Sequence, residues 1–345
     1  MTKKSISCFR GFVFSWLIAA CASAAFAQSQ TRPHVQALAS DRFEGRLAGS
    51  NGERLAADYI VGELQKIGAK PLPGQKDFRL PFEFTAGEGP KIHNPVRSGT
   101  DIDRLITYRA AELGYVAESV RRVATHFGAK VPVIGFCGAP FTLASYMIEG
   151  SGSRNYIETK RLMYGNSEAW SVLMEKLVHV LAEYGTEQVR AGAAAFQVFD
   201  SWVGCLSPAD YRKYALPHTR ALVQRLKHSG VPVIYFGTDS ATLLRDMKST
   251  GADVIGLDWR IELHRGWDVL GHEVAVQGNL DPVVLFADEQ TVRQRTRDVL
   301  DQAGGRAGHI FNLGHGILPG TPVENVIALV DEVHAYSERQ MGVTA

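Results

Sequence analysis

The sequence predicts an α/β fold in which short apolar strands alternate with amphipathic helices, the order of elements in a (β/α) barrel. Two observations support this fold class. From about residue 113 onward, helix patterns and apolar runs follow one another in regular alternation. Most of the apolar runs end in glycines and polar residues, as barrel strands do at the edge that carries the ligand site.

The alternating region contains six strand candidates and six helix candidates. The strands are predicted over residues 131–136, 193–199, 231–236, 253–257, 273–277 and 309–313. The helices are predicted over residues 113–127, 167–190, 218–229, 240–249, 288–303 and 322–338. A closed (β/α)8 barrel needs eight strands, so the sequence predicts a barrel that is truncated at its N-terminal end.

Charge and cysteine content exclude several classes of protein. The 345 residues include 37 Lys plus Arg and 36 Asp plus Glu, a balance that gives no reason to expect nucleic acid or an anionic membrane as partner. Four cysteines are present, Cys8 and Cys21 near the N-terminus and Cys137 and Cys205 farther along. They form no CxxC pair, so neither a disulfide framework nor a cysteine zinc site is predicted.

The first 27 residues have the pattern of a secretory signal peptide. Basic residues precede an apolar run over residues 11–20, and a small-residue pattern before Gln28 predicts cleavage after Ala27. Residues Ile18 to Cys21 also resemble a bacterial lipoprotein box, in which Cys21 would carry the lipid. The shortness of the apolar run favours simple cleavage. No transmembrane span is expected, because a span needs about 20 apolar residues.

The segment 28–84 differs in character from the rest of the chain. An amphipathic helix is predicted after Ser50, which forms a capping box with Glu53. Its apolar face consists of Leu55, Tyr59, Ile60, Leu64 and Ile67. The run from His34 to Pro71, followed by the strand-like Phe78 to Phe84, resembles the beginning of secreted zinc aminopeptidases. In that family the metal ligands lie in the following sheet, which does not occur in this sequence.

Five motifs in the alternating region carry a second resemblance: CGAPFTLASYMIEG, FQVFDSWVG, GLDWR, QGNLDP and NLGHGILPGTP. In this order they resemble the motifs of the uroporphyrinogen decarboxylase family of heme biosynthesis, from about residue 83 to the C-terminus. The character of the sequence changes between Leu80 and Gly89. We therefore interpret the chain as a chimera of a signal peptide (1–27), an aminopeptidase-like fragment (28–84) and a decarboxylase-like barrel (85–345). A natural gene fusion and an assembly error would both produce it.

The resemblance implies a reaction and a set of site residues. The family removes carbon dioxide from the four acetate arms of a cyclic tetrapyrrole, uroporphyrinogen, and uses neither cofactor nor metal. By resemblance, Tyr146 contacts the substrate and helps position a catalytic Asp, while Ser201 and His315 bind substrate carboxylates. That Asp, and the arginines of an N-terminal RQAGRY motif, have no counterpart in this sequence, so impaired activity is expected. The family also suggests a homodimer in the cytoplasm, whereas the signal peptide predicts export.

Each of these three residues also has a purely structural interpretation. Tyr146 can be a helix-packing aromatic with a solvated hydroxyl, and Ser201 can be a helix cap. His315 lies in a Gly-His-Gly turn, where the glycines can serve the backbone alone and the imidazole can be merely solvated.

Four further residues at predicted strand ends are assigned structural roles. Asp258 and Asp281 are expected to accept hydrogen bonds from loop amides. Cys137 is predicted to be a small buried residue rather than a nucleophile, because no basic residue is adjacent. His309 is expected to open a strand and not to bind metal, since His315 lies at the opposite end of that strand.

The sequence also has features of other functions. The first segment favours a secreted zinc aminopeptidase, and the loss of two strands favours a fusion product without function. A zinc-dependent branch of the same superfamily transfers methyl groups from corrinoids and uses a late cysteine ligand. This chain has no cysteine after Cys205, which disfavours that branch.

Overall fold

The computed structural model describes residues 37–38, 40, 42, 51–66, 68, 70–71, 91–105, 113–128 and 130–340. The chain divides into two compact units, residues 1–79 and 80–345. In the first unit, helix α3 (Asn51–Lys66) confirms the predicted amphipathic helix. Its expected apolar face is not fully covered, since the side chain of Ile60 is 45% exposed. The signal peptide, the capping residue Ser50 and the strand-like run Phe78 to Phe84 lie outside the described residues.

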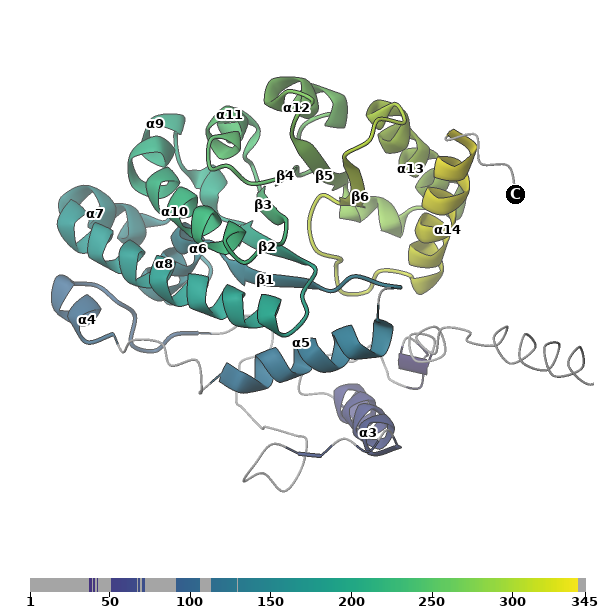
Figure 1. Cartoon of the computed structure of the whole chain (residues 1–345), viewed down its shortest axis with the longest axis horizontal. Coiled ribbons are helices and arrows are strands. Elements are labelled where there is room, and N and C mark those ends of the chain that lie inside the picture. Colours follow the sequence, from purple (N-terminus) through teal and green to yellow (C-terminus); the bar gives the residue numbers. More distant parts are fainter. Residues whose placement is uncertain are drawn as a thin grey trace, which may run out of the picture. The chain divides into compact units, whose positions relative to one another are not determined.

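The second unit contains a six-stranded parallel sheet in which neighbouring strands follow one another in chain order. Figure 1 shows the strands side by side in this order. Each strand overlaps a predicted one, and the consecutive parallel order is that of a (β/α) barrel, so the expected fold class is confirmed. The strands are β1 (Ile134–Gly138), β2 (Ala195–Asp200), β3 (Val233–Gly237), β4 (Val254–Gly256), β5 (Ala275–Leu280) and β6 (His309–Leu313).

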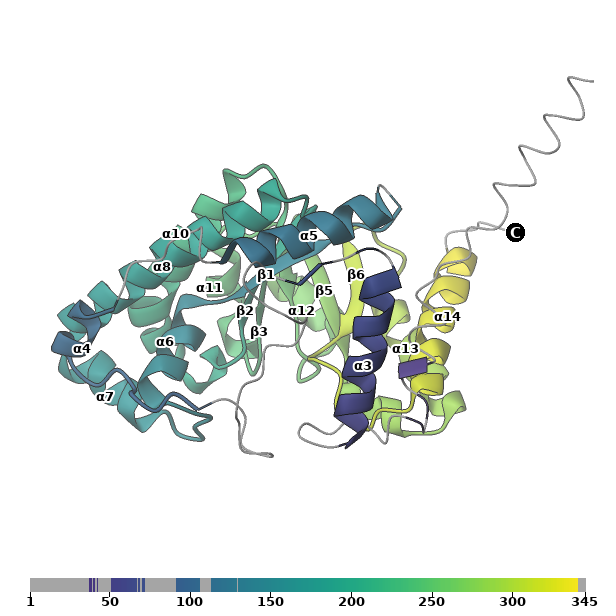
Figure 2. The same ribbon diagram turned by 90° about the horizontal axis from the view of Figure 1, so that it is seen from below.

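Helices connect the strands, and the predicted ones are confirmed with small shifts of their ends. Helices α4, α6, α7, α9 and α12 lie outside the six predicted helix ranges. Figures 1 and 2 both show α13 and α14 side by side at the end of the chain. The helices are α4 (Gly99–Asp103), α5 (Gly114–Phe127), α6 (Pro140–Glu149), α7 (Ile157–Gly165), α8 (Ser167–Arg190), α9 (Pro208–Asp210), α10 (Leu216–Lys227), α11 (Leu244–Lys248), α12 (Leu263–Leu270), α13 (Glu289–Ala303) and α14 (Val323–Gln340). No helix within these described ranges is long and apolar enough to cross a membrane.

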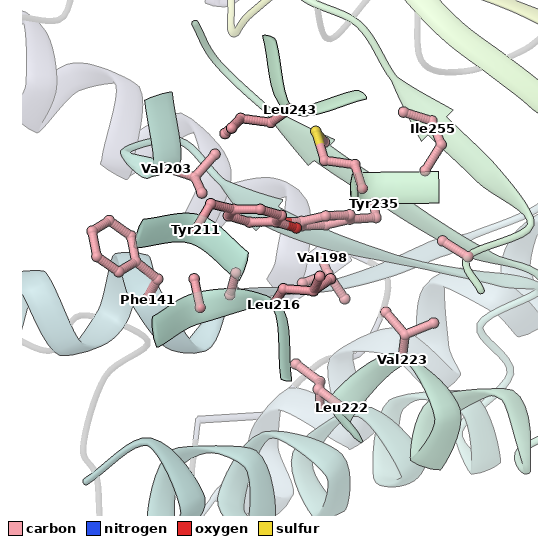
Figure 3. Packing of buried hydrophobic residues seen from close by; sticks show 14 of the residues in the cluster. Phe141, Val198, Val203, Tyr211, Leu216, Leu222, Val223, Tyr235, Leu243 and Ile255 are labelled. Carbon is pink, nitrogen blue, oxygen red and sulfur yellow. The ribbon is translucent and has the colours of Figure 1, made fainter. Parts of the chain in front are cut away.

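One face of the sheet forms the core with the surrounding helices. Side chains on a strand alternate between faces, so the two faces have different surroundings. On the helix-covered face, Val198, Tyr235, Ile255 and Val276 are fully buried. Figure 3 shows three of these, Val198, Tyr235 and Ile255, together with helix residues such as Leu222 and other members of the same cluster. Burial on this face fixes which strand residues point toward the other face.

The opposite face is closed in its centre and open at the edge strands. Phe236 on the central strand β3 is 5% exposed, whereas Phe136 on β1 is 58% exposed and Ile310 on β6 is 41% exposed. Within the described part of the chain, no strand pairs with the outer edges of β1 and β6. This pattern fits a (β/α)8 barrel of which the described residues form six strands.

A side chain covers part of the free edge of β1. The amide of Gln188, on α8, accepts a hydrogen bond from the backbone N–H of Phe136 at 3.1 Å and donates one to the carbonyl of the same residue at 3.0 Å. These are the groups that a neighbouring strand would use. Gln188 is buried, at 3% exposed. Its amide satisfies this pair of β1 backbone groups in place of a neighbouring strand.

Candidate active site at the C-terminal edge of the sheet

The three predicted site residues lie beyond the C-terminal ends of different strands. Tyr146 is on α6, which begins two residues after β1 ends. Ser201 directly follows β2, and His315 follows β6 by two residues. Because parallel strands end at the same edge of a sheet, all three belong to that edge, where (β/α) barrels carry their active sites.

Tyr146 and the segment after β2 are in direct contact. The ring of Tyr146 stacks on that of Trp202, with centroids 3.8 Å apart and planes inclined by 24°. The backbone N–H of Trp202 donates to Oγ1 of Thr142 at 3.2 Å, and Oγ1 of Thr238 donates to the carbonyl oxygen of Ser201. The helix-cap interpretation of Ser201 is wrong. The helical turn that follows, Val203–Cys205, has Trp202 at its N-cap position, and no side chain caps it.

His315 lies at another part of the edge, among aromatic rings. Its exposed imidazole is 6.3 Å from the ring of Phe236 and 6.5 Å from that of Trp259, measured between centroids. Gly314 permits this approach, because a Cβ atom there would lie 2.6 Å from the backbone nitrogen of Trp259. The guanidinium of Arg260 lies 4.0 Å from the centroid of the Trp259 ring, which adds a cation to this part of the edge.

A row of phenylalanines crosses three neighbouring strands and ends at His315. Phe136 on β1 meets Phe199 on β2 edge to face at 5.9 Å, and Phe199 meets Phe236 on β3 in the same way at 5.9 Å. Phe236 in turn faces His315. We did not predict this row as part of the site. A signal was present, since one phenylalanine occurs near the C-terminal end of each of three consecutive strands.

Asp258 and Asp281 have the structural roles that were predicted for them. The carboxylate of Asp258, 1% exposed, accepts from the N–H of Asp239 at 2.8 Å and pairs with Nη1 of Arg260 at 2.6 Å. The carboxylate of Asp281 accepts from the N–H of Val283 at 2.9 Å. Both aspartates therefore hold loops at the C-terminal edge in place.

Cys137 and His309 also lie where they were predicted. Cys137 is buried, and burial raises the pKa of its thiol well above the usual range, which does not suit a nucleophile. His309 is the first residue of β6, and its Nε2 lies 2.9 Å from the carbonyl oxygen of Gly278. Burial lowers the pKa of His309. In the described part of the chain, no three His, Cys, Asp or Glu residues are grouped so that they could hold a metal ion.

A buried carboxylate beside Ser201 was not predicted. Asp200, the last residue of β2, is fully buried and accepts hydrogen bonds from Oγ1 of Thr142 at 2.7 Å and from the hydroxyl of Tyr235 at 2.8 Å. Burial raises its pKa to about 6, although both hydroxyl donors lower it. A lone acid at the end of the apolar strand AFQVFD was the available signal.

Comparison with known proteins identifies the family of the chain. Residues 75–336 match the family model described as "Uroporphyrinogen decarboxylase (URO-D)". A protein named uroporphyrinogen decarboxylase from Koribacter versatilis is 62% identical over 264 residues, which cover 76% of this chain and 75% of that protein. One of the same name from Carboxydothermus hydrogenoformans is 47% identical over 291 residues, covering 82% and 83% of the two chains.

A solved structure, a methyltransferase from Methanosarcina mazei, is similar in fold. It aligns with a TM-score of 0.60 at 17% identity, over 73% of this chain and 72% of that one. At this identity the likeness concerns the fold alone. The family match begins slightly before the expected position of about residue 83 and includes all six strands and the edge on which Tyr146, Ser201 and His315 lie. On this match and on the identity of its relatives, the chain belongs to the uroporphyrinogen decarboxylase family.

Proposed function

We propose that the chain binds uroporphyrinogen, a cyclic tetrapyrrole with acidic arms, at the C-terminal edge of the sheet. Tyr146, Ser201 and His315 are the proposed substrate contacts, with Ser201 and His315 on carboxylates. The observation that carries the proposal is the row Phe136, Phe199 and Phe236, which leads to the imidazole of His315 at the same edge of the sheet as Tyr146 and Ser201. The pyrrole rings of the macrocycle can pack against aromatic side chains while its carboxylate arms reach hydroxyl and imidazole donors.

The family reaction is a decarboxylation of the acetate arms that needs neither metal nor cofactor. Carbon dioxide leaves when the electrons of the broken bond have an acceptor, and a protonated pyrrole ring is one. The protein then has to orient the ring, hold its carboxylates and stabilise the positive charge that develops on the pyrrole. The family's Asp for that last task and its RQAGRY arginines are missing from this sequence. We therefore propose that this chain holds the carboxylates of the substrate but decarboxylates it no faster than the spontaneous reaction.

Binding can be measured with uroporphyrin, the stable oxidised analogue, by titration of its absorbance band in the presence of the full chain. His315→Ala is expected to weaken binding by about tenfold, through the loss of a hydrogen bond to a carboxylate. The matched control is His228→Ala, which removes an exposed imidazole at the end of α10. Equal affinities of both variants and the unmodified protein would exclude His315 as a substrate contact. Coproporphyrin, which lacks the acetate carboxylates, should bind more weakly than uroporphyrin.

The homodimer and the origin of the first 84 residues also stay proposals. We infer from the resemblance that the barrel forms a homodimer, which light scattering of the purified protein measures directly. We infer from the change of character between Leu80 and Gly89 that the segment expected over residues 1–84, as far as it precedes the family match at residue 75, comes from a secreted zinc aminopeptidase-like protein. Sequencing genomic DNA across codons 75 to 95 tests this, because an assembly error would not be found there.

The two parts of the chain predict different cellular locations. Tetrapyrrole synthesis places the family reaction in the cytoplasm, whereas the signal-peptide pattern of residues 1–27 predicts export. Fractionation of cells that express the full chain distinguishes these outcomes. Zinc bound stoichiometrically, together with cleavage of an aminoacyl reporter, would instead support the aminopeptidase alternative.

A further inference from the structure

Asp200 lies at the junction of three elements behind the proposed site. It ends β2 and directly precedes Ser201. Strand alternation directs its side chain to the helix-covered face, like that of Val198, while Phe199 between them belongs to the aromatic row on the other face. Asp200 therefore does not face the proposed ligand, and any role in ligand binding has to be exerted through its neighbours.

Hydrogen bonds from two elements satisfy the Asp200 carboxylate. Oδ1 accepts from Thr142 on α6, and Oδ2 accepts from Tyr235 on β3. Because the Tyr235 hydroxyl donates to Asp200, it accepts from the hydroxyl of Tyr211 at 3.1 Å. Figure 3 shows the rings of Tyr211 and Tyr235 meeting end to end among buried apolar side chains. In these surroundings a missing acceptor costs more than it would in water.

Thr142 links the Asp200 carboxylate to the proposed site. Its hydroxyl donates to Asp200 and accepts from the N–H of Trp202, so one oxygen joins the carboxylate to the segment that follows it. Thr142 also lies one helical turn before Tyr146 on α6. Since Tyr146 stacks on Trp202, helix α6 contacts the segment after β2 twice, through Thr142 and through Tyr146.

We propose that Asp200 is a positioning residue for the substrate site: through Thr142 it holds the Ser201–Trp202 segment against α6 and thereby sets the placement of Tyr146 relative to Ser201. The inference rests on the proposed function of Tyr146 and Ser201. It also makes a statement about the free protein, namely that the stack of Tyr146 on Trp202 depends on the Asp200–Thr142 hydrogen bond.

The network offers variants that separate positioning from stability. Thr142→Val removes the bridging hydroxyl with little change of shape, whereas Thr142→Ser keeps the hydroxyl. Asp200→Asn keeps the size of the side chain but offers one acceptor where the carboxylate offers two. Tyr211→Phe removes a buried hydroxyl from the far end of the same network and leaves the bond between Asp200 and Thr142 intact. It is therefore the matched control for a loss of stability alone.

Two readouts are measured on the full-length protein, together with thermal melting. The first, which needs no ligand, is the ¹⁹F resonance of Trp202 in protein labelled with 5-fluorotryptophan, assigned by its loss in Trp202→Phe. The second is the affinity for uroporphyrin. Thr142→Val and Asp200→Asn are expected to move the Trp202 resonance and to weaken binding by about tenfold, the loss typical of one hydrogen bond. Thr142→Ser is expected to restore both readouts, and Tyr211→Phe to change neither.

Contrary outcomes are distinct from one another. If Thr142→Val and Asp200→Asn lower the melting temperature as Tyr211→Phe does, but keep the Trp202 resonance and the affinity of the unmodified protein, Asp200 has only a structural role. If the unmodified protein does not bind uroporphyrin, the proposed function fails, and the resonance of Trp202 still decides whether Asp200 positions this segment. An unshifted resonance in both variants overturns the inference in either case.

Discussion

Tyr146 and Trp202, which come from different strand connections, stack with their ring centroids 3.8 Å apart. Tyr146 follows β1 and Trp202 follows β2, so the contact joins two of the loops that form the C-terminal edge. The Tyr146 side chain is 37% exposed, which leaves part of it accessible beside Ser201. The stack therefore serves packing and, in the proposed function, the placement of a ligand contact.

Two substitutions separate these roles of Tyr146. Tyr146→Phe keeps the stack and removes the hydroxyl, whereas Tyr146→Ala removes both. An aromatic pair contributes about 1 kcal/mol beyond its buried area, so only Tyr146→Ala is expected to lower the free energy of unfolding measurably. Both variants are expected to weaken uroporphyrin binding. Unchanged binding by Tyr146→Phe, measured by the absorbance titration, would restrict Tyr146 to packing.

Gly314 and Gly316 flank His315 but differ in the space around them. A Cβ atom at Gly314 would lie 2.6 Å from the backbone nitrogen of Trp259, whereas one at Gly316 would meet nothing within 4 Å. Gly314→Ala is therefore expected to displace the turn and to lower the free energy of unfolding by about 1–3 kcal/mol. Urea denaturation measures this change, and Gly316→Ala is the control. Similar losses in the two variants would show that the close approach to Trp259 is not needed.

The buried carboxylate of Asp200 predicts a pH dependence of stability. Burial raises its pKa to about 6, so the folded chain keeps this proton over a range in which the unfolded chain has released it. The folded state then binds more protons, and this contribution to stability falls as the pH rises from about 4 to about 6. The titratable groups that face it are Tyr235, Tyr211 and Cys205. Burial raises the pKa of each, that of Cys205 to about 11, so they do not titrate in this range.

Asp200→Asn removes this titration. The free energy of unfolding of the unmodified protein, minus that of Asp200→Asn, is expected to fall by roughly 2 kcal/mol between pH 4 and pH 7. Urea denaturation at several pH values measures it, and subtraction removes the contribution of the other carboxylates. A difference that is constant or rises with pH would mean that Asp200 is ionised throughout this range.

The strands were predictable because each is a short apolar run between turn residues. A parallel strand buried on both faces shows this pattern in the sequence. Helix α6 was missed for a related reason. Pro140, Phe141, Ala144 and Ile148 are all buried, and a helix covered on several sides lacks the polar face that marks amphipathic helices. Its ends were visible, with Pro140 in the first turn and Gly150 with φ +82° after the last.

The site was predictable only in part. Tyr146, Ser201 and His315 were named through a resemblance of motifs, whereas strand ends alone indicated only the edge on which they lie. The contact of Phe136 with Phe199 and the hydrogen bond of Asp200 to Thr142 depend on strand register and helix placement. These join residues far apart in the chain, and no local pattern encodes them.

Anaerobic incubation of uroporphyrinogen with the full chain tests the central claim most directly, namely that the chain binds tetrapyrrole at the edge carrying His315 but, without the family's catalytic Asp, does not decarboxylate it. Loss of one well-placed electrostatic group typically costs about 100- to 1000-fold in rate, and the RQAGRY arginines are absent as well. We predict uroporphyrin binding that depends on His315, with no coproporphyrinogen formed above the spontaneous rate. Coproporphyrinogen formation that His315→Ala abolishes would contradict this and would show that the chain catalyses the reaction without that Asp.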